Sequence, residues 1–112
     1  MTNDSQKKVA QLQLFQQNLQ ALLVQKQQFQ LQLNEAESAL TELKGTQQAY
    51  KIIGSLMVLS DRGELEKGLK ERKATVELRV KNIEMQEERL RKKADELQRE
   101  IVQAMKKEGG ES

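Results

Sequence analysis

The chain has 112 residues, of which 37% are hydrophobic, 3% aromatic and 32% charged, and it contains no Pro, Cys or His. This usage is typical of long helices rather than of a globule with a packed core, and the missing Cys and His exclude disulfides and the commonest metal ligands. A net charge of +2 and the lack of a long apolar run indicate neither nucleic-acid nor membrane binding, so we expect a cytoplasmic protein without metal or cofactor.

Residues 1–45 form the first expected element, a coiled-coil helix. Apolar residues recur there at alternating steps of three and four, which defines an a/d heptad seam with one polar member. The seam consists of Leu12, Phe15, Leu19, Leu22, Lys26, Phe29, Leu33, Ala36, Leu40 and Leu43. Gly45 follows the seam and suits a helix C-cap in the left-handed conformation.

Residues 46–62 break the heptad pattern. Two short apolar runs, 49–53 and 56–59, flank Gly54-Ser55, which predicts a β-hairpin with a type II′ turn. Both faces of this hairpin would be apolar, and an isolated hairpin is marginally stable in water. We expect hairpins of other subunits to cover it; the alternative is a hairpin folded down onto its own helices.

Residues 63–108 form the second expected helix, with the same alternation of steps. Its seam consists of Leu69, Lys73, Val76, Val80, Ile83, Glu87, Leu90, Ala94, Leu97, Ile101 and Ala104. Asp61 is expected to cap this helix, and Glu64 to complete a capping box. Gly109-Gly110 ends the pattern, so residues 109–112 are expected to be a flexible tail.

The short connector favours one structural domain, an all-α dominated fold in which two long helices form an antiparallel coiled coil with the β-hairpin at the bend. Two registers fit, because Lys26 can share a layer with either Leu90 or Ile83. In both registers Glu87 lies in the neighbouring layer. We interpret Lys26 and Glu87 as a device that sets the coil register; the alternative is that both side chains extend outward to solvent.

Some apolar residues lie outside the seam. Leu14, Ala21, Val24 and Leu31 occupy c and f positions on the first helix, with Leu23 at their edge, and Val9, Ala10, Val102 and Met105 lie near the open end of the coil. A continuous apolar strip usually marks an interaction surface. The open end is therefore a candidate site for apolar partners, whereas Val24 and Leu31 fit packing against a sister coil equally well.

The sequence contains no recognisable enzyme site. Adjacent carboxylates such as Glu87-Glu88 point to different sides of a helix and form no acid/base pair. The basic run at residues 89–93 is flanked by acidic residues, which is typical of a solvated coil surface. No glycine-rich phosphate loop is present. We therefore expect a protein that is not an enzyme.

The connector between the two helices carries a family resemblance. The sequence Tyr50-Lys51-Ile52-Ile53-Gly54, followed by an apolar strand and a charged helix, resembles the beta subunits of the prefoldin family. The short length, the lack of Cys and the minimal tails are similar to those of archaeal-type subunits. The resemblance implies a hexamer of two alpha and four beta subunits, in which the hairpins join into an intersubunit β-barrel.

The resemblance also implies a function. Prefoldins are ATP-independent chaperones (holdases) that bind unfolded polypeptides at the coiled-coil tips and pass them to a group II chaperonin. Carried onto this chain, the subunit-assembly residues would be Tyr50, Ile52, Ile53, Gly54, Leu56, Val58 and Leu59, and the client-binding residues would be Val9, Leu12, Leu14, Phe15, Ile101, Val102 and Met105. The alternative is a structural coiled-coil stalk or tether subunit that binds a folded partner.

Overall fold

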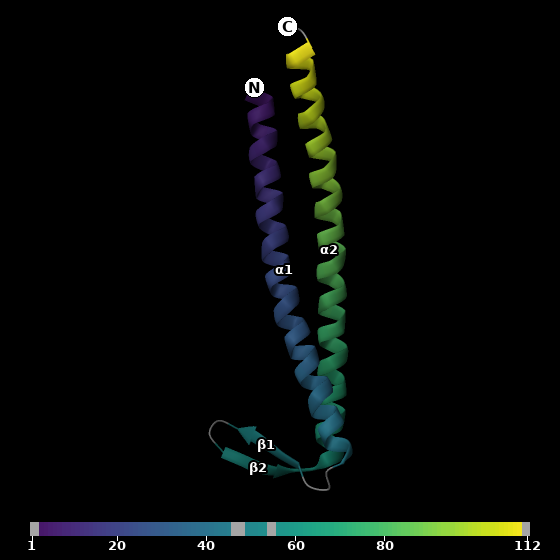
Figure 1. Ribbon diagram of the computed structural model, residues 1–112. Helices are drawn as coiled ribbons and strands as arrows, with labels where there is room; N and C mark the ends of the chain where they lie inside the picture. Colours follow the sequence, from purple (N-terminus) through teal and green to yellow (C-terminus); the bar gives the residue numbers. More distant parts are fainter. Residues whose placement is uncertain (1–2, 46–48, 54–55, 111–112) are drawn as a thin grey trace. The chain divides into compact units, whose positions relative to one another are not determined.

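The computed structural model of the chain describes residues 3–45, 49–53 and 56–110, with side chains placed at 3–45 and 61–108. Helix α1 (Asn3–Lys44) is followed by strands β1 (Ala49–Ile53) and β2 (Leu56–Ser60) and by helix α2 (Arg62–Gly110) (Figure 1). Two helices of 42 and 49 residues therefore make up most of the described chain. None of the described helices is both long enough and apolar enough to cross a membrane.

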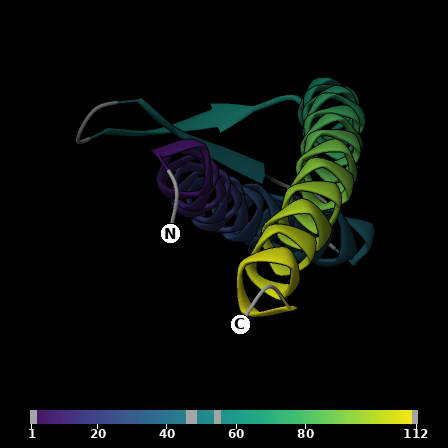
Figure 2. The same ribbon diagram turned by 90° about the horizontal axis from the view of Figure 1, so that it is seen from above.

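The chain divides into two compact units. The first unit contains residues Met1–Lys26 and Asn82–Ser112, and the second contains Gln27–Lys81. In each unit a stretch of α1 lies antiparallel beside a stretch of α2, as the purple and yellow-green ribbons of the first unit show (Figure 2).

The core of the first unit follows the predicted seam. Every seam position of this unit is buried or half-buried, whereas most residues between the seam positions are exposed. The buried residues of this unit are Ser5, Ile83, Glu87, Leu97 and Ile101. Ser5 lies seven residues before Leu12 and extends the seam by one heptad. The hydrophobic pattern did not indicate this position because Ser is small and polar.

The second unit repeats this arrangement and adds the strands. Its buried residues are Ala36, Leu43 and Val76, and its other seam positions are half-buried. Strands β1 and β2 pair antiparallel, with Ala49 opposite Ser60 and Ile53 opposite Leu56. Both strands fall within one residue of the expected ranges. The turn predicted at Gly54-Ser55 lies outside the described residues.

The interhelical pairs of the first unit decide between the two possible registers. Each step forward along α1 is a step backward along α2, so layering Lys26 with Ile83 puts Lys8 opposite residue 101. Layering Lys26 with Leu90 would put Lys8 opposite residue 108. Lys8 Nζ lies 3.5 Å from Glu100 Oε2, so the first unit adopts the Ile83 register.

The second unit adopts the same register. The Ile83 layering puts Phe29 opposite residue 80 and Glu37 opposite residue 72, whereas the alternative puts them opposite residues 87 and 79. The guanidinium carbon of Arg79 lies 5.6 Å from the centroid of the Phe29 ring, and Lys73 Nζ lies 3.6 Å from Glu37 Oε1. Both contacts lie within one residue of the Ile83 layering.

The helix ends confirm one prediction and correct two. The Glu64 N–H donates to Asp61 Oδ1 over 3.2 Å, so Asp61 caps α2 as expected. Gly45 is not left-handed: its N–H donates to the Glu42 carbonyl over 3.4 Å, which closes α1 with a tight final turn that needs no positive φ. Helix α2 continues to Gly110, two residues beyond its expected end.

Candidate functional site

Three apolar side chains of the first unit are exposed beside the seam. Leu14 is 53% exposed, Val102 43% and Met105 53%. They occupy c, b and e positions of their helices, which the pairing of α1 with α2 does not use. All three belong to the predicted client-binding set, and their apolar surface is available to a partner.

The other members of that set belong to the seam or its edge. Val9, Leu12 and Phe15 are half-buried, and Ile101 is only 7% exposed. Ile101 occupies an a position, so its side chain packs in the core of the helical pair. While this unit is closed, Ile101 cannot contact a partner, and the exposed part of the predicted site is smaller than the sequence indicated.

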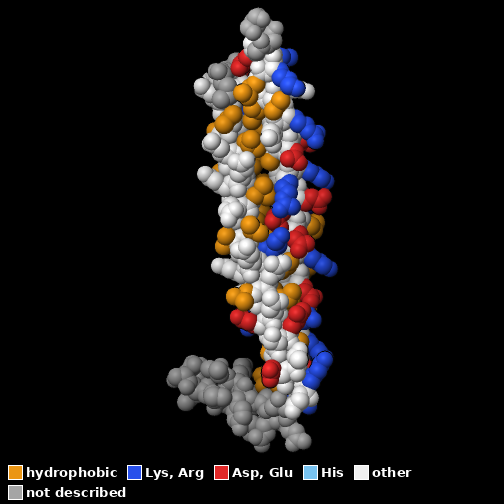
Figure 3. Space-filling view, in the orientation of Figure 1, with side chains coloured by type: hydrophobic (Ala, Val, Ile, Leu, Met, Phe, Trp, Pro, Cys, Tyr) orange, Lys and Arg blue, Asp and Glu red, His pale blue; other side chains and the backbone are white. Residues whose placement is uncertain are grey.

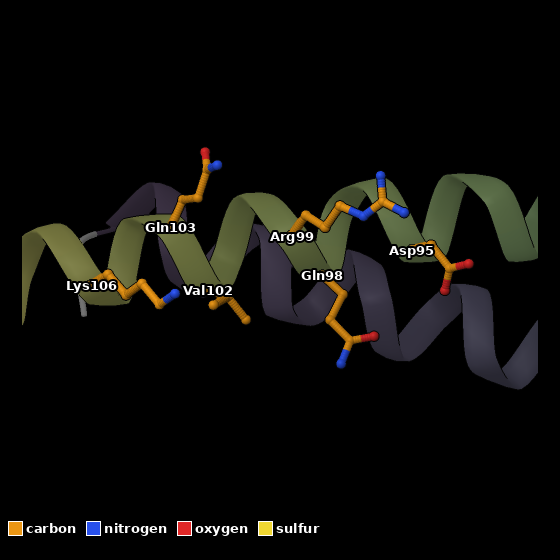
Figure 4. A pocket seen from close by; sticks show the side chains of 6 residues that line it. All are labelled: Asp95, Gln98, Arg99, Val102, Gln103 and Lys106. Carbon is orange, nitrogen blue, oxygen red and sulfur yellow. The ribbon is translucent and has the colours of Figure 1, made fainter.

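A shallow hollow surrounds Val102 on the surface of α2. It has a volume of about 490 Å³ and is lined by Asp95, Gln98, Arg99, Val102, Gln103 and Lys106. All six side chains come from α2, and Val102 is the apolar one among them (Figure 4). A partner at this hollow would therefore contact one aliphatic side chain within a polar and charged rim.

Four other large apolar side chains of the described helices are also exposed. Val24 and Leu31 are exposed on α1, as expected for apolar residues that lie outside the seam. Leu78 and Met85 are exposed on α2 and were not singled out from the sequence. The two residues are seven apart and both occupy f positions, which could have indicated a shared outward face. Their charged neighbours instead led to the interpretation of this face of α2 as solvated surface.

Lys26 and Glu87 meet inside the first unit, as the sequence predicted. Lys26 Nζ donates a hydrogen bond of 2.8 Å to Glu87 Oε1, and the side chains are 20% and 4% exposed. The second carboxylate oxygen, Oε2, lies 3.6 Å from Arg91 Nη2. Lys26 turns its ammonium group toward Glu87, so the outward orientation that the sequence left open is not the observed one.

The described residues form no arrangement typical of an enzyme. Within this part of the chain, no group of three or more Asp or Glu side chains could hold a metal ion. The pKa of Glu66 is lowered by a hydrogen bond from Lys70 and by the charge of that side chain, with Nζ 3.1 Å from Oε1. This pair is an exposed i,i+4 pair on one helix, of the kind that supports helices generally.

The predicted assembly residues lie in the paired strands, with the exception of Gly54, which is outside the described residues. The backbone register places Tyr50 opposite Leu59 and Ile52 opposite Met57. The sheet has two strands, so the outer edge of each is unpaired within the described part of the chain. Such edges are templates for pairing with another chain.

The chain has the features of a coiled-coil protein that binds partners through its surface. Its two heptad helices pair antiparallel, a strand pair lies between them in the sequence, and apolar residues are exposed beside the seam. The family model described as "Prefoldin subunit" matches residues 6–108. The chain belongs to the prefoldin family, whose members are non-enzymatic chaperone subunits.

Individual relatives are beta subunits. The chain is 41% identical to prefoldin subunit beta of Methanothrix thermoacetophila over 89% of its own length and 86% of the relative's. It is 37% identical to prefoldin subunit beta of Thermococcus onnurineus, over 91% and 90%. The crystal structure of the prefoldin beta subunit from Thermococcus strain KS-1 superposes with a TM-score of 0.86 at 36% identity, covering 92% of this chain and 93% of that one. The chaperone function and the resemblance to beta subunits are thereby confirmed, and the alternative of a structural stalk is not favoured.

Proposed function

We propose that this chain is a cytoplasmic holdase subunit that binds unfolded polypeptides through the distal residues of its helices and passes them, without ATP, to a group II chaperonin. The observation that carries the proposal is the exposure of Leu14, Val102 and Met105 in a subunit of a chaperone family. Unfolded polypeptides offer apolar side chains to such a surface.

The energetics of these residues suit reversible binding. Burial of apolar surface contributes about 25 cal/mol per Å², so a few half-exposed side chains hold a segment weakly. Met105 is flexible and polarisable, which lets it adapt to side chains of different shape. Several such sites on one body raise the overall affinity by about two to four orders of magnitude without any new contact. Release then needs only a competing binder.

The body that joins these sites is proposed to form from the strands. An isolated two-stranded sheet is marginally stable, and β1 and β2 leave two edges unpaired within the described chain. Membership of the prefoldin family implies assembly with other prefoldin subunits. We propose that hairpins of two alpha and four beta subunits pair into an intersubunit β-barrel. The residues of this chain in that barrel would be Tyr50, Ile52, Ile53, Gly54, Leu56, Val58 and Leu59.

The Lys26–Glu87 pair is proposed to fix the coil register. A heptad seam can shift by seven residues and still layer a with d, so apolar packing alone discriminates poorly between registers. A register outside the two that keep Lys26 and Glu87 in neighbouring layers would leave the carboxylate of Glu87, 4% exposed, without the ammonium group that lies 2.8 Å away. An unpaired buried charge is strongly destabilising, so the pair penalises the registers that separate Lys26 from Glu87.

An aggregation assay tests the client-binding proposal. The chain, assembled with an alpha subunit, is added at stoichiometric amounts to a chemically unfolded enzyme during dilution, and light scattering is recorded. We expect delayed aggregation for the unmodified protein, a weaker delay for Leu14→Ser with Val102→Ser, and no change for the matched control Gln30→Ser with Gln86→Ser, whose side chains are exposed elsewhere on the two helices. Unimpeded aggregation with the unmodified protein would refute the holdase proposal.

A further inference from the structure

The surface of α1 in the first unit differs in charge from the surface of α2. Residues 9–25 contain no Lys, Arg, Asp or Glu, although the chain as a whole is 32% charged. Eleven of these residues are exposed, and seven of the eleven are Gln or Asn. We call these exposed residues the uncharged face of α1. Its apolar members are Ala10, Leu14, Ala21 and Val24.

The facing helix has the opposite character. Between Glu84 and Glu100, ten of the thirteen exposed residues of α2 are charged. Figure 3 shows the charged side chains of this unit gathered over α2, while uncharged polar and apolar side chains cover this stretch of α1. The surface of a soluble helical protein normally mixes both signs of charge over all its faces. The lack of charge on one face therefore requires a reason that solubility does not supply.

We propose that the uncharged face of α1 is the surface along which an unfolded client polypeptide lies, and that it makes client binding independent of the sign of the client's charge. This inference rests on the proposed holdase function and names its surface and substrate class. The face continues from Leu14, one of the exposed distal residues, so it enlarges a site that three scattered side chains would otherwise have to supply.

The amide side chains suit the backbone of an unfolded client. A Gln or Asn side chain offers two N–H donors and a carbonyl acceptor, so it can pair with either polar group of a peptide unit. An extended client carries unpaired N–H and C=O groups along its whole length. Amide side chains around Leu14, Ala21 and Val24 can therefore bond the backbone while the apolar residues take up client side chains. Residues 10–25 extend over about 23 Å, which matches about seven residues of an extended chain.

The lack of charge argues for a client rather than for a folded partner. Folded partners are recognised through complementary charge patterns, which select one sign and reject the other. Unfolded polypeptides of different sequence vary in charge, so a charged face would repel part of them. A second copy of this chain is the remaining occupant, because two uncharged faces also do not repel each other.

Site-specific photo-crosslinking tests this inference on the complete hexamer. A photoreactive amino acid replaces Gln17 on the uncharged face or, as the matched control, Gln86 on the charged surface of α2; both residues are exposed in the first unit. The probe client is a reduced and carboxymethylated protein that stays unfolded in buffer. We expect client adducts at position 17 to exceed those at position 86 by about fivefold or more. Equal yields, or adducts at position 17 with another subunit, would overturn the inference.

A variant with added charge tests the same inference independently, through the affinity for peptides of different net charge. Unmodified protein should bind labelled unfolded peptides of equal apolar content and of negative, zero and positive net charge with affinities within about threefold of one another. Gln13→Glu with Gln17→Glu should weaken binding of the negative peptide about tenfold relative to the positive one. A strong sign preference of the unmodified protein, or no preference in the variant, would contradict the inference. Protein that binds no unfolded client at all would refute the holdase proposal itself, whereas normal client binding without these effects would refute the uncharged-face inference alone.

Discussion

Lys26 and Glu87 are 61 residues apart in the sequence, yet Lys26 Nζ lies 2.8 Å from Glu87 Oε1 inside the first unit. The carboxylate also lies 3.6 Å from Arg91 Nη2, so both of its oxygens face a cation. The pair occupies two a positions of seams that are otherwise almost wholly apolar. A polar pair in this place reduces stability compared with apolar residues but disfavours registers that would separate its two members.

Removing one member of this pair should cost more stability than removing both. Lys26→Met leaves the Glu87 carboxylate buried with only the more distant Arg91, and we expect a loss of about 3 kcal/mol. Lys26→Leu with Glu87→Leu should be neutral or stabilising by about 1–4 kcal/mol. Denaturant unfolding at fixed protein concentration measures both. The exposed pair Lys92–Glu88 is the control: Glu88→Gln should change stability by less than about 1 kcal/mol.

If Lys26→Met proved as harmless as Glu88→Gln, Glu87 would not depend on Lys26, and the proposed register role would be lost.

The register itself can be tested by cysteine pairs, since the chain has no native Cys. In the observed register Leu19 shares a layer with Leu90, whereas in the shifted register it shares one with Leu97. Leu19→Cys with Leu90→Cys should form an intramolecular disulfide under mild oxidation, read from the mass under non-reducing conditions. Leu19→Cys with Leu97→Cys should stay reduced. The reverse pattern would mean that the coil adopts the shifted register.

The sequence predicted the seam but could not choose its register, for a physical reason. Heptad packing repeats every seven residues, so layering Lys26 with Ile83 or with Leu90 buries equivalent surface. The choice of register depends on individual side-chain pairs such as Lys8 with Glu100, which do not recur every seven residues. Exposure was harder to predict: Ile101 belongs to the seam and is buried, whereas Met85 lies among charged residues and is exposed.

The N-terminal cap of α2 should contribute measurably to stability. Asp61→Ala removes the oxygen that accepts the Glu64 N–H over 3.2 Å, and we expect a loss of about 1 kcal/mol. Asp61→Asn retains an acceptor at this position and should lose less. Hydrogen exchange of the Glu64 amide reports the local effect. An unchanged exchange rate in Asp61→Ala would show that this cap does not protect the first turn.

Two glycines of α2 should respond differently to alanine. A Cβ at Gly68 meets nothing within 4 Å, so Gly68→Ala should stabilise the helix by up to about 1 kcal/mol. A Cβ at Gly63 would lie 3.2 Å from Asp61 Oδ1, so Gly63→Ala should stabilise less because it crowds the cap. Thermal unfolding of both variants at equal concentration measures the difference. Equal gains would indicate that the cap tolerates the added methyl group.

The native mass of the protein tests most directly the proposal that several copies join through their strands and leave the distal residues free to bind clients. Native mass spectrometry is carried out on the chain with an alpha subunit, for the unmodified sequence and for Ile53→Asp, which puts a charge into the strand pair. We predict a hexamer of two alpha and four beta subunits for the unmodified protein and dissociated subunits for the variant. A monomer of the unmodified chain in the presence of the alpha subunit would contradict the account.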